Sequence, residues 1–269
     1  MKTFAKYLAL LLVMAFFMTP ILWTVITAIK PAELISAHPI VWLFKPTLDH
    51  FRVIFFEDNI VTPLVNSTII AIFSTVGVLV TAAPASYALS RFQVPFGQQL
   101  ASYFLSARMA PPVTVVLPLF LIFRNLNLID THAALIAAYV TVNMPFAIWM
   151  IKGFFDEIPR ELDEAALLDG CSRFHAFVRI VLPLAAPGLA ATAIISFIFS
   201  WNEFLFAILL TNFHARTLPV AASALMTDRM VLWGELCATA IIIYTPVMLF
   251  AMLVRKYLIK GFTFGAVVQ

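Results

Sequence analysis

Charged residues are scarce in this chain of 269 residues: 12% are Asp, Glu, Lys or Arg, whereas 62% are hydrophobic. Soluble domains carry about twice that share of charge. The formal net charge is only +3 and the basic residues form no cluster, so this excess reflects the composition of loops and not a nucleic-acid-binding surface. The composition excludes an ordinary soluble domain and predicts a polytopic membrane protein.

Cysteine is nearly absent as well. The two that are present, Cys171 and Cys237, lie far apart, one in a polar segment and the other at the edge of an apolar run. We therefore expect no disulfide, and no spacing of cysteine and histidine matches a metal site. The sequence also lacks the Gly-x-x-x-x-Gly-Lys-Ser/Thr loop that cradles nucleotide phosphates, so the chain itself is not expected to bind ATP.

Long apolar runs are what the sequence has in abundance. A membrane-spanning helix needs about 20 mostly apolar residues. Six runs qualify, near residues 8–29, 65–90, 99–124, 133–152, 186–211 and 236–257. They are too long, and alternate too little, for the strands of a membrane β-barrel. The predicted fold is an all-α membrane protein of six transmembrane helices, forming a single permease-like domain over residues 1–269.

Two of these runs have features that refine the prediction. The first contains an uncharged stretch from Tyr7 to Ile29 with no Ala-x-Ala-like site after it, which we interpret as a retained span and not as a signal peptide. The third contains Pro111, Pro112 and Pro118, so it is expected to be kinked or broken.

The distribution of lysine and arginine predicts the orientation. Six spans place both ends of the chain on one side of the membrane, and Lys and Arg are more frequent on that side. Because cytoplasmic loops carry the excess of Lys and Arg, both termini are predicted to be cytoplasmic. The loops near residues 30–62 and 212–235 are predicted to lie outside.

One polar loop, at about residues 154–185, interrupts the apolar sequence. Its acidic residues are Asp156, Glu157, Glu161, Asp163, Glu164 and Asp169, and its arginines are Arg160, Arg173 and Arg179. So many charges in one segment of a membrane protein indicate a structured loop with a partner in water. An ordinary amphipathic loop at the membrane interface is the alternative that composition alone leaves open.

Local signals predict a helix, a glycine turn and a second helix within the polar loop. Pro159 suits the first position of a helix, and the acidic residues that follow complement the positive end of its dipole. Gly170 stands where a left-handed C-terminal cap is expected, and Ser172 can N-cap the second helix. The apolar stripe expected on that second helix comprises Phe174, Phe177, Val178 and Val181.

The spacing of Glu164-Ala165-Ala166, Gly170 and Ile180-Val181-Leu182-Pro183 resembles the EAA loop of permease subunits in ATP-binding-cassette (ABC) importers. Other segments match in the order of the maltose-type carbohydrate family, in its shorter permease subunit. They are Ala85-Ser86-Tyr87-Ala88-Leu89-Ser90-Arg91-Phe92, Pro111-Pro112, Trp201-Asn202-Glu203-Phe204, Thr217-Leu218-Pro219, Trp233-Gly234-Glu235 and Gly261-Phe262-Thr263-Phe264-Gly265-Ala266-Val267. The resemblance covers nearly the whole chain, with Cys171 standing where the family often has alanine.

This resemblance implies a type I ABC importer permease in a bacterial inner membrane, moving a sugar or sugar derivative by alternating access. The implied partners are a second homologous permease, a dimer of ATPase subunits and an extracytoplasmic sugar-binding protein. ATP and Mg would bind to the ATPase, and this chain would need no cofactor. The residues implied to couple it to the ATPase are Glu164, Ala165, Ala166, Leu168, Asp169, Gly170, Arg173 and Phe174.

A path for the substrate is expected where polar residues enter the apolar runs. Glu203 and Arg108 are the ionisable residues most clearly inside predicted spans, where an unpaired charge is costly and function is the default hypothesis. Trp201, Asn202 and Asn143 are further candidates, because sugars are held by hydrogen bonds and aromatic faces. The alternatives are that the charges pair and that Trp201 serves packing.

Two other classes of protein remain as alternatives. A secondary transporter driven by an ion gradient could use Glu203 as a midplane carboxylate, but no internal repeat supports that class. An intramembrane enzyme would need a metal motif or a Ser/His pair at a usable spacing, which the sequence lacks. The chain is therefore predicted to be a transport subunit and not an enzyme, and its particular sugar is not specified by the sequence.

Overall fold

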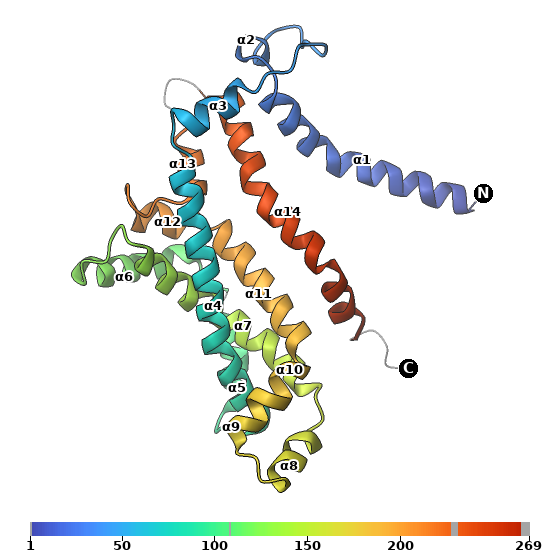
Figure 1. The fold of residues 1–269 in the computed structure, drawn as a ribbon, viewed down its shortest axis with the longest axis vertical. Helices are drawn as coiled ribbons and strands as arrows, with labels where there is room; N and C mark the ends of the chain where they lie inside the picture. Colours follow the sequence, from blue (N-terminus) through green and yellow to red (C-terminus); the bar gives the residue numbers. More distant parts are fainter. Residues whose placement is uncertain (1, 108, 227–230, 265–269) are drawn as a thin grey trace. The chain divides into compact units, whose positions relative to one another are not determined.

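The computed structural model of the chain describes residues 2–107, 109–226 and 231–264. Over these ranges the structure is helical, without a β-strand, although one isolated bridge joins Met226 and Val231. Figure 1 shows the helices, coloured in chain order. The chain divides into two compact units. Unit 1 comprises Met1–Leu64 and Leu218–Met248, and unit 2 comprises Val65–Thr217 and Leu249–Gln269.

Four helices of the described residues are long and apolar enough to cross a membrane. They are α1 (Lys2–Ala28), α4 (Val61–Arg91), α7 (His132–Asp156) and α14 (Trp233–Phe264). A fifth crossing is obtained if the helical segment Arg173–Leu184 and α11 (Ala186–Trp201), which bend by 76° at their junction, are counted as one broken span. These helices confirm the all-α membrane class.

The structure differs from six continuous spans at the third and fifth runs. The third is divided into α5 (Gly97–Ala107) and α6 (Pro112–Asn125), each shorter than the about 20 residues that cross a bilayer. Pro111 is the N-cap of α6 and a proline occupies its first turn, where the missing N–H is no loss. The fifth run stops at Trp201 and resumes as α12 (Leu205–Leu210).

The remaining helices are short. Those of unit 1 are α2 (Ala32–Ile35), α3 (Asp49–Phe56) and α13 (Leu218–Ser223). Those of unit 2 form the polar loop: α8 (Glu161–Leu168), α9 (Arg173–Ala176), the π-helical η1 (Phe177–Val181) and α10 (Leu182–Leu184).

In unit 1, the imidazole of His50 joins three segments. Its Nδ1 lies 3.2 Å from Glu235 Oε1 on α14, and its Nε2 lies 2.8 Å from the carbonyl oxygen of Lys30. The ring occupies the space beside Gly234, where any Cβ would overlap it. Glycine at this position therefore permits α3 and α14 to approach each other.

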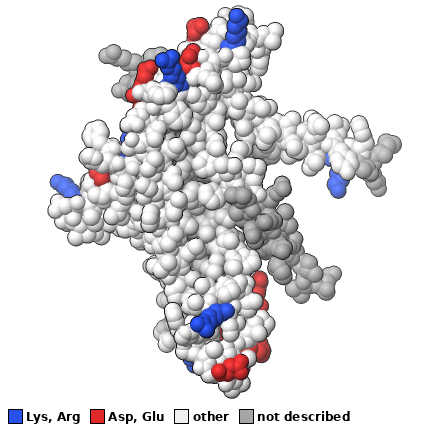
Figure 2. All heavy atoms as spheres, in the orientation of Figure 1, with Lys and Arg blue, Asp and Glu red and all other residues white. Residues whose placement is uncertain are grey.

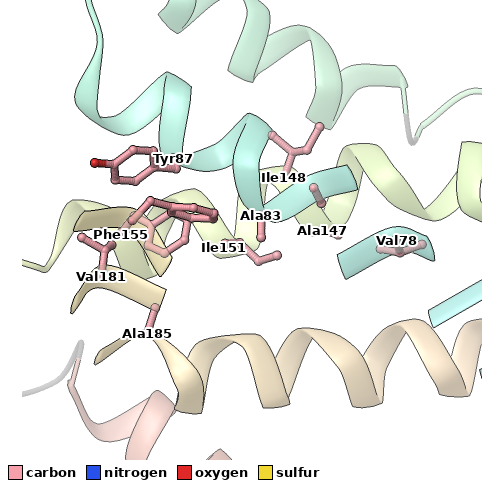
Figure 3. Close-up of a cluster of buried hydrophobic side chains, with 11 residues drawn as sticks. Val78, Ala83, Tyr87, Ala147, Ile148, Ile151, Phe155, Val181 and Ala185 are labelled. Atoms are coloured by element: carbon pink, nitrogen blue, oxygen red, sulfur yellow. The ribbon is translucent and has the colours of Figure 1, made fainter. Parts of the chain in front are cut away.

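The core of unit 2 joins the polar loop to two of the long helices (Figure 3). Its buried members are Val78, Ala82, Ala83 and Tyr87 of α4, Ala147, Ile148, Ile151 and Phe155 of α7, and Phe177, Val181 and Ala185 of the loop. Small residues let helix backbones approach closely in a membrane protein. The close approach is visible at Ser86, whose hydroxyl donates to the carbonyl of Ile148 at 3.0 Å.

Charge is distributed unevenly over unit 2. Acidic and basic side chains gather at the end that carries α8 and α9, at the bottom of the view in Figure 2. The long helices above that end present a surface with few charges in this view. An apolar belt next to a charged end is the arrangement expected of a helix bundle that emerges from a bilayer into water.

Candidate coupling loop and candidate substrate path

The first half of the polar loop ends in a glycine turn, as the sequence predicts. Helix α8 begins at Glu161, two residues after Pro159, with three acidic residues in its first turn. Gly170 has φ +84°, and its N–H donates to the carbonyl of Leu167 at 3.1 Å while Cys171 N–H donates to Ala166 at 3.0 Å. This pair of bonds is a Schellman cap, which requires a left-handed residue and so favours glycine.

The second half of the loop departs from a regular helix. Ser172 caps α9 as predicted, because its Oγ accepts the N–H of His175 at 3.3 Å. The chain then widens into the π-helical turn η1. The predicted stripe is split: Phe177 and Val181 are buried, whereas Phe174 of α9 and Val178 are exposed. The π turn changes the angular spacing of the side chains within η1, which contributes to this split at Val178.

Most of the predicted coupling residues lie on the surface of the loop. Leu168 is 89% exposed and Phe174 71% exposed, which is unusual for large apolar side chains on a charged element. The other exposed members are Glu164, Ala165, Asp169, Gly170 and Arg173. Ala166 is the exception, because it is only 4% exposed and packs inside the chain. The loop thus presents apolar groups rimmed by charges, a composition typical of a docking surface.

The loop is attached to the end of α4 through Asp163, a contact that the sequence does not predict. Tyr87 donates its phenolic hydrogen to Asp163 Oδ1 at 2.7 Å. Arg91 Nε lies 2.8 Å from Asp163 Oδ2, an ion pair that is largely buried. Both oxygens of the carboxylate are therefore occupied by residues of α4.

A second group of contacts surrounds this ion pair. Ser90 donates to Asp156 Oδ1 at 2.6 Å, and Arg160 donates to the carbonyl of Ser90 at 2.9 Å. The guanidinium of Arg173 lies over the ring of Phe92, 5.1 Å from its centroid. A cavity of about 190 Å³ is lined by Phe92, Arg160 and Arg173 together with Tyr87, Arg91 and Asp163. Directed polar contacts, and not close packing alone, therefore position the loop against α4.

Glu203, the strongest candidate for the substrate path, is hydrogen-bonded to protein groups. Tyr139 donates its hydroxyl to Glu203 Oε2 at 3.1 Å, and the N–H groups of Phe206 and Ala207 donate to the carboxylate at 3.0 and 3.2 Å. These two N–H groups belong to the first turn of α12, so the carboxylate caps that helix. The contacts offset the cost of desolvating a charge.

The other path candidates are placed differently from one another. Trp201 is 2% exposed and stacks on Phe197, with ring centroids 5.6 Å apart, so its faces are not presented at the surface of this chain. Asn143 is buried and donates to Ser200 at 3.2 Å. Asn202 is exposed. The structure brings Asn202 and Glu203 together as neighbours at the break between α11 and α12, and Arg108 lies outside the described residues.

A further polar site in unit 2, which the sequence does not predict, is built on Asp130 in the turn between α6 and α7. Its carboxylate accepts the backbone N–H groups of residues 212–215 at 2.9 to 3.1 Å. Burial alone would raise the pKa of Asp130, but these four N–H donors outweigh it and lower the pKa from 3.8 to about 2. Nearby, Asn66 donates to the carbonyls of His214 and Arg216 at 2.8 and 3.0 Å.

No group of three or more His, Cys, Asp or Glu side chains is gathered as a metal site in the part of the chain that the structure describes. Glu203 and Asp130 each bind backbone N–H groups, as structural caps do. Taken with the long apolar helices and the exposed polar loop, these features define a multi-pass membrane protein with a charged, partly apolar surface on that loop.

Comparison with known proteins identifies the family. The model of the family described as "Binding-protein-dependent transport system inner membrane component" matches residues 77–263. The chain belongs to this family and is a transport component, not an enzyme.

Relatives match over almost their whole length. A probable ABC transporter permease protein, y4oR, of Sinorhizobium fredii is 38% identical over 95% of this chain and 92% of its own. The trehalose transport system permease protein SugB of Mycobacterium tuberculosis is 36% identical over 98% of this chain and 97% of its own. A chain of a bacterial ABC transporter involved in alginate import has the same fold, with a TM-score of 0.77, 20% identity and coverage of 95% of this chain and 96% of that one.

Proposed function

We propose that this chain is a permease subunit of an ATP-driven carbohydrate importer and forms one half of the pathway through the membrane. The observation that carries the proposal is the polar loop, which presents Leu168 and Phe174 beside a Schellman turn at Gly170 and is anchored to α4 through Asp163. A surface of this kind on a membrane protein needs a partner in water. Relatives that are 33% to 36% identical over 92% to 98% of this chain are named as permeases for trehalose, for trehalose and maltose, and for diacetylchitobiose.

The proposed partners follow from this role. A second, homologous permease supplies the other half of the pathway, and two ATPase subunits bind the polar loops and hydrolyse ATP with Mg. An extracytoplasmic binding protein delivers the sugar, as the complex of an alginate transporter with its periplasmic protein illustrates for a chain of similar fold, with a TM-score of 0.67. In this arrangement ATP binding moves the polar loop, and the loop moves the spans between inward-open and outward-open states.

The proposed orientation places both termini and the polar loop in the cytoplasm. The excess of Lys and Arg on that side supports it. Asp130 precedes the first residue of α7, and the polar loop follows its last residue. With the polar loop in the cytoplasm, the Asp130 site therefore lies at the extracytoplasmic end of α7. The cargo is a sugar or sugar derivative, and Asn202 and Glu203 at the break after α11 are the proposed contributors of this chain to its path.

Reconstitution tests the proposal against the ion-coupled alternative. The chain is co-expressed with a second permease and an ATPase, purified through a tag on the chain and placed in liposomes with a binding protein. We expect the ATPase to co-purify, and ATP hydrolysis to be stimulated by binding protein loaded with trehalose, maltose or diacetylchitobiose. Uptake that persists without ATP and stops when an ion gradient is collapsed would overturn the proposal in favour of a secondary transporter.

A further inference from the structure

The end of α4 contacts the polar loop at Ile158, Asp163 and Phe177, and no residue of α4 is among those implied to couple the loop to the ATPase. We propose that Tyr87 and Arg91 of α4 are positioning residues for coupling, which receive the movement of the polar loop through Asp163 and carry it into a membrane-spanning helix. The inference rests on the proposed function and adds the connection between the loop and the span.

Tyr87 links the loop to two helices with one side chain. Its hydroxyl donates to Asp163 on α8 at 2.7 Å. Its ring centroid lies 4.7 Å from that of Phe177 on η1 and 6.0 Å from that of Phe155 on α7. Aromatic rings at these separations attract each other beyond the area they bury. A displacement of α8 or η1 therefore acts on α4 at Tyr87.

Arg91 makes the second connection, one helical turn further along the same face of α4. Its Nε lies 2.8 Å from Asp163 Oδ2, and its terminal amino group donates to the carbonyl of Ile158 at 2.9 Å. The side chains of Arg91 and Asp163 are only 6% and 12% exposed, so neither can exchange its partner for bulk water without a local opening. The hydrogen bond from Tyr87 and the ion pair with Arg91 thus reach the two oxygens of Asp163 from the same face of α4.

Polar contacts and packing both join the end of α4 to the loop. A cavity of about 190 Å³ leaves part of this boundary unfilled, next to Tyr87, Arg91 and Asp163. Helix α4 runs for 31 residues with Pro84 inside it, so a displacement at Arg91 enters the helix seven residues beyond this proline. The physical basis of the inference is thus a long helix joined to the exposed polar loop through the largely buried carboxylate of Asp163.

The alternative is that Asp163 only holds the loop in its folded position. Tyr87→Phe separates the two roles, because it keeps the stacked ring and removes only the hydroxyl that reaches Asp163. Tyr103→Phe is the matched control, since the Tyr103 side chain is largely exposed and distant in sequence from the loop. Asp163→Asn and Arg91→Lys weaken the contact between α4 and the loop by changing the other two residues that form it. The exchange Arg91→Asp with Asp163→Arg restores opposite charges and tests for rescue.

The experiment uses the full complex in liposomes and two readouts. The first is ATP hydrolysis with and without sugar-loaded binding protein. The second reports movement of α4: in a background with Cys171→Ser and Cys237→Ser, the thiol introduced by Val65→Cys, at an exposed position near the other end of α4, is labelled with a maleimide with and without ATP. A complex that fails to hold the ATPase is recognised by co-purification.

We expect Tyr87→Phe and Asp163→Asn to retain the ATPase and its basal hydrolysis. In these variants stimulation by loaded binding protein should fall about tenfold, the size of effect expected from one hydrogen bond to a charged group, and the ATP-dependent change in labelling of α4 should disappear. The charge exchange should recover part of both signals, and Tyr103→Phe should match the wild type. Wild-type stimulation and labelling in Tyr87→Phe and Asp163→Asn would overturn this inference while leaving the importer function intact.

A failure of the proposed function has a different signature. In that case the wild-type complex itself shows no stimulation by loaded binding protein and no ATP-dependent labelling at position 65. That outcome overturns both proposals together. If Tyr87→Phe and Asp163→Asn lose stimulation but keep the ATP-dependent change in labelling, the inference is also overturned. Movement would then reach α4 without the contacts of Asp163 with Tyr87 and Arg91.

Discussion

The hydroxyl of Tyr139 donates a hydrogen bond of 3.1 Å to the carboxylate of Glu203, from one long helix to the break between α11 and α12. The same carboxylate accepts two N–H groups of α12, so Glu203 fixes the start of that helix relative to α7. A carboxylate committed to three protein donors is poorly suited to bind and release an ion. We therefore expect Glu203 to serve the proposed path by fixing the start of α12.

The first prediction concerns Glu203. Glu203→Gln keeps one acceptor oxygen and should lower stability by about 1–3 kcal/mol, whereas Glu203→Leu should cost more because the N–H groups of α12 lose their partner. Thermal unfolding in detergent measures both. Tyr139→Phe combined with Glu203→Gln should cost less than the sum of the two single changes, since they remove the same contact. Normal stability and normal sugar uptake in Glu203→Leu would contradict both the cap and the path.

The second prediction concerns the turn of the polar loop. Gly170 has φ +84°, a conformation in which a β-branched residue is an outlier, although nothing lies within 4 Å of a Cβ built there. Gly170→Val should therefore strain the backbone alone, reorient α8 relative to α9, and abolish stimulated ATP hydrolysis while the spans stay inserted. Gly153→Val is the control, because a Cβ at Gly153 also meets nothing but the residue lies within helix α7. Stimulation equal to wild type in Gly170→Val would show that this turn is not part of the coupling element.

The third prediction concerns Asp130. Its pKa is lowered to about 2, so its contribution to stability is fully present above the ordinary value of 3.8 and is lost as the pH falls through about 2. Asp130→Asn should cost about 1–3 kcal/mol at neutral pH, because one amide oxygen replaces a carboxylate that serves several N–H groups. The difference in melting temperature between wild type and Asp130→Asn should shrink between pH 4 and pH 2.

Asp169→Asn is the control for Asp130, since Asp169 is an exposed carboxylate on the polar loop. At neutral pH, Asp169→Asn should change the free energy of unfolding by no more than about 0.5 kcal/mol, as most surface substitutions do. A difference between wild type and Asp130→Asn that does not change over this pH range would show that ionised Asp130 does not hold residues 212–215.

The fourth prediction concerns the contact between Gly234 and His50 in unit 1. A Cβ at position 234 would overlap the imidazole, so Gly234→Ala should destabilise the protein by about 1–3 kcal/mol through overpacking. Combining it with His50→Ala should recover part of this loss, because the smaller side chain frees the space. Gly153→Ala, in open space on α7, should be neutral or stabilising. Additive losses in the double variant would argue against a direct contact.

The fifth prediction concerns orientation and needs no substitution in the loop. Cys171 is exposed on the polar loop, and Cys237→Ser removes the other cysteine. A membrane-impermeant maleimide should label Cys171 in inside-out vesicles and not in intact spheroplasts. Labelling in spheroplasts would place the polar loop outside and contradict the proposed docking of an ATPase.

Local signals in the sequence predict the features that depend on neighbouring residues. The apolar runs predict the long helices, because transfer to lipid depends on composition over about 20 residues. The glycine turn at Gly170 and the cap at Ser172 are confirmed, since each satisfies backbone groups within a few residues. The break at Pro111 is confirmed for the same reason, because proline acts on its own turn of helix.

Burial and long-range contacts were decided by the tertiary structure. Ala166 and Trp201 are buried, although the sequence places them among docking and path residues, because exposure depends on which distant helices pack beside them. Tyr87 meets Asp163 across 76 residues, and Asp130 meets Ala215 across 85. No local propensity encodes such pairs, which form only when α4, α7 and the loops are packed. The sequence by itself thus determined the membrane class, the polar loop and its turn, whereas only the packed chain decided which carboxylates hold that loop and the break after α11 in place.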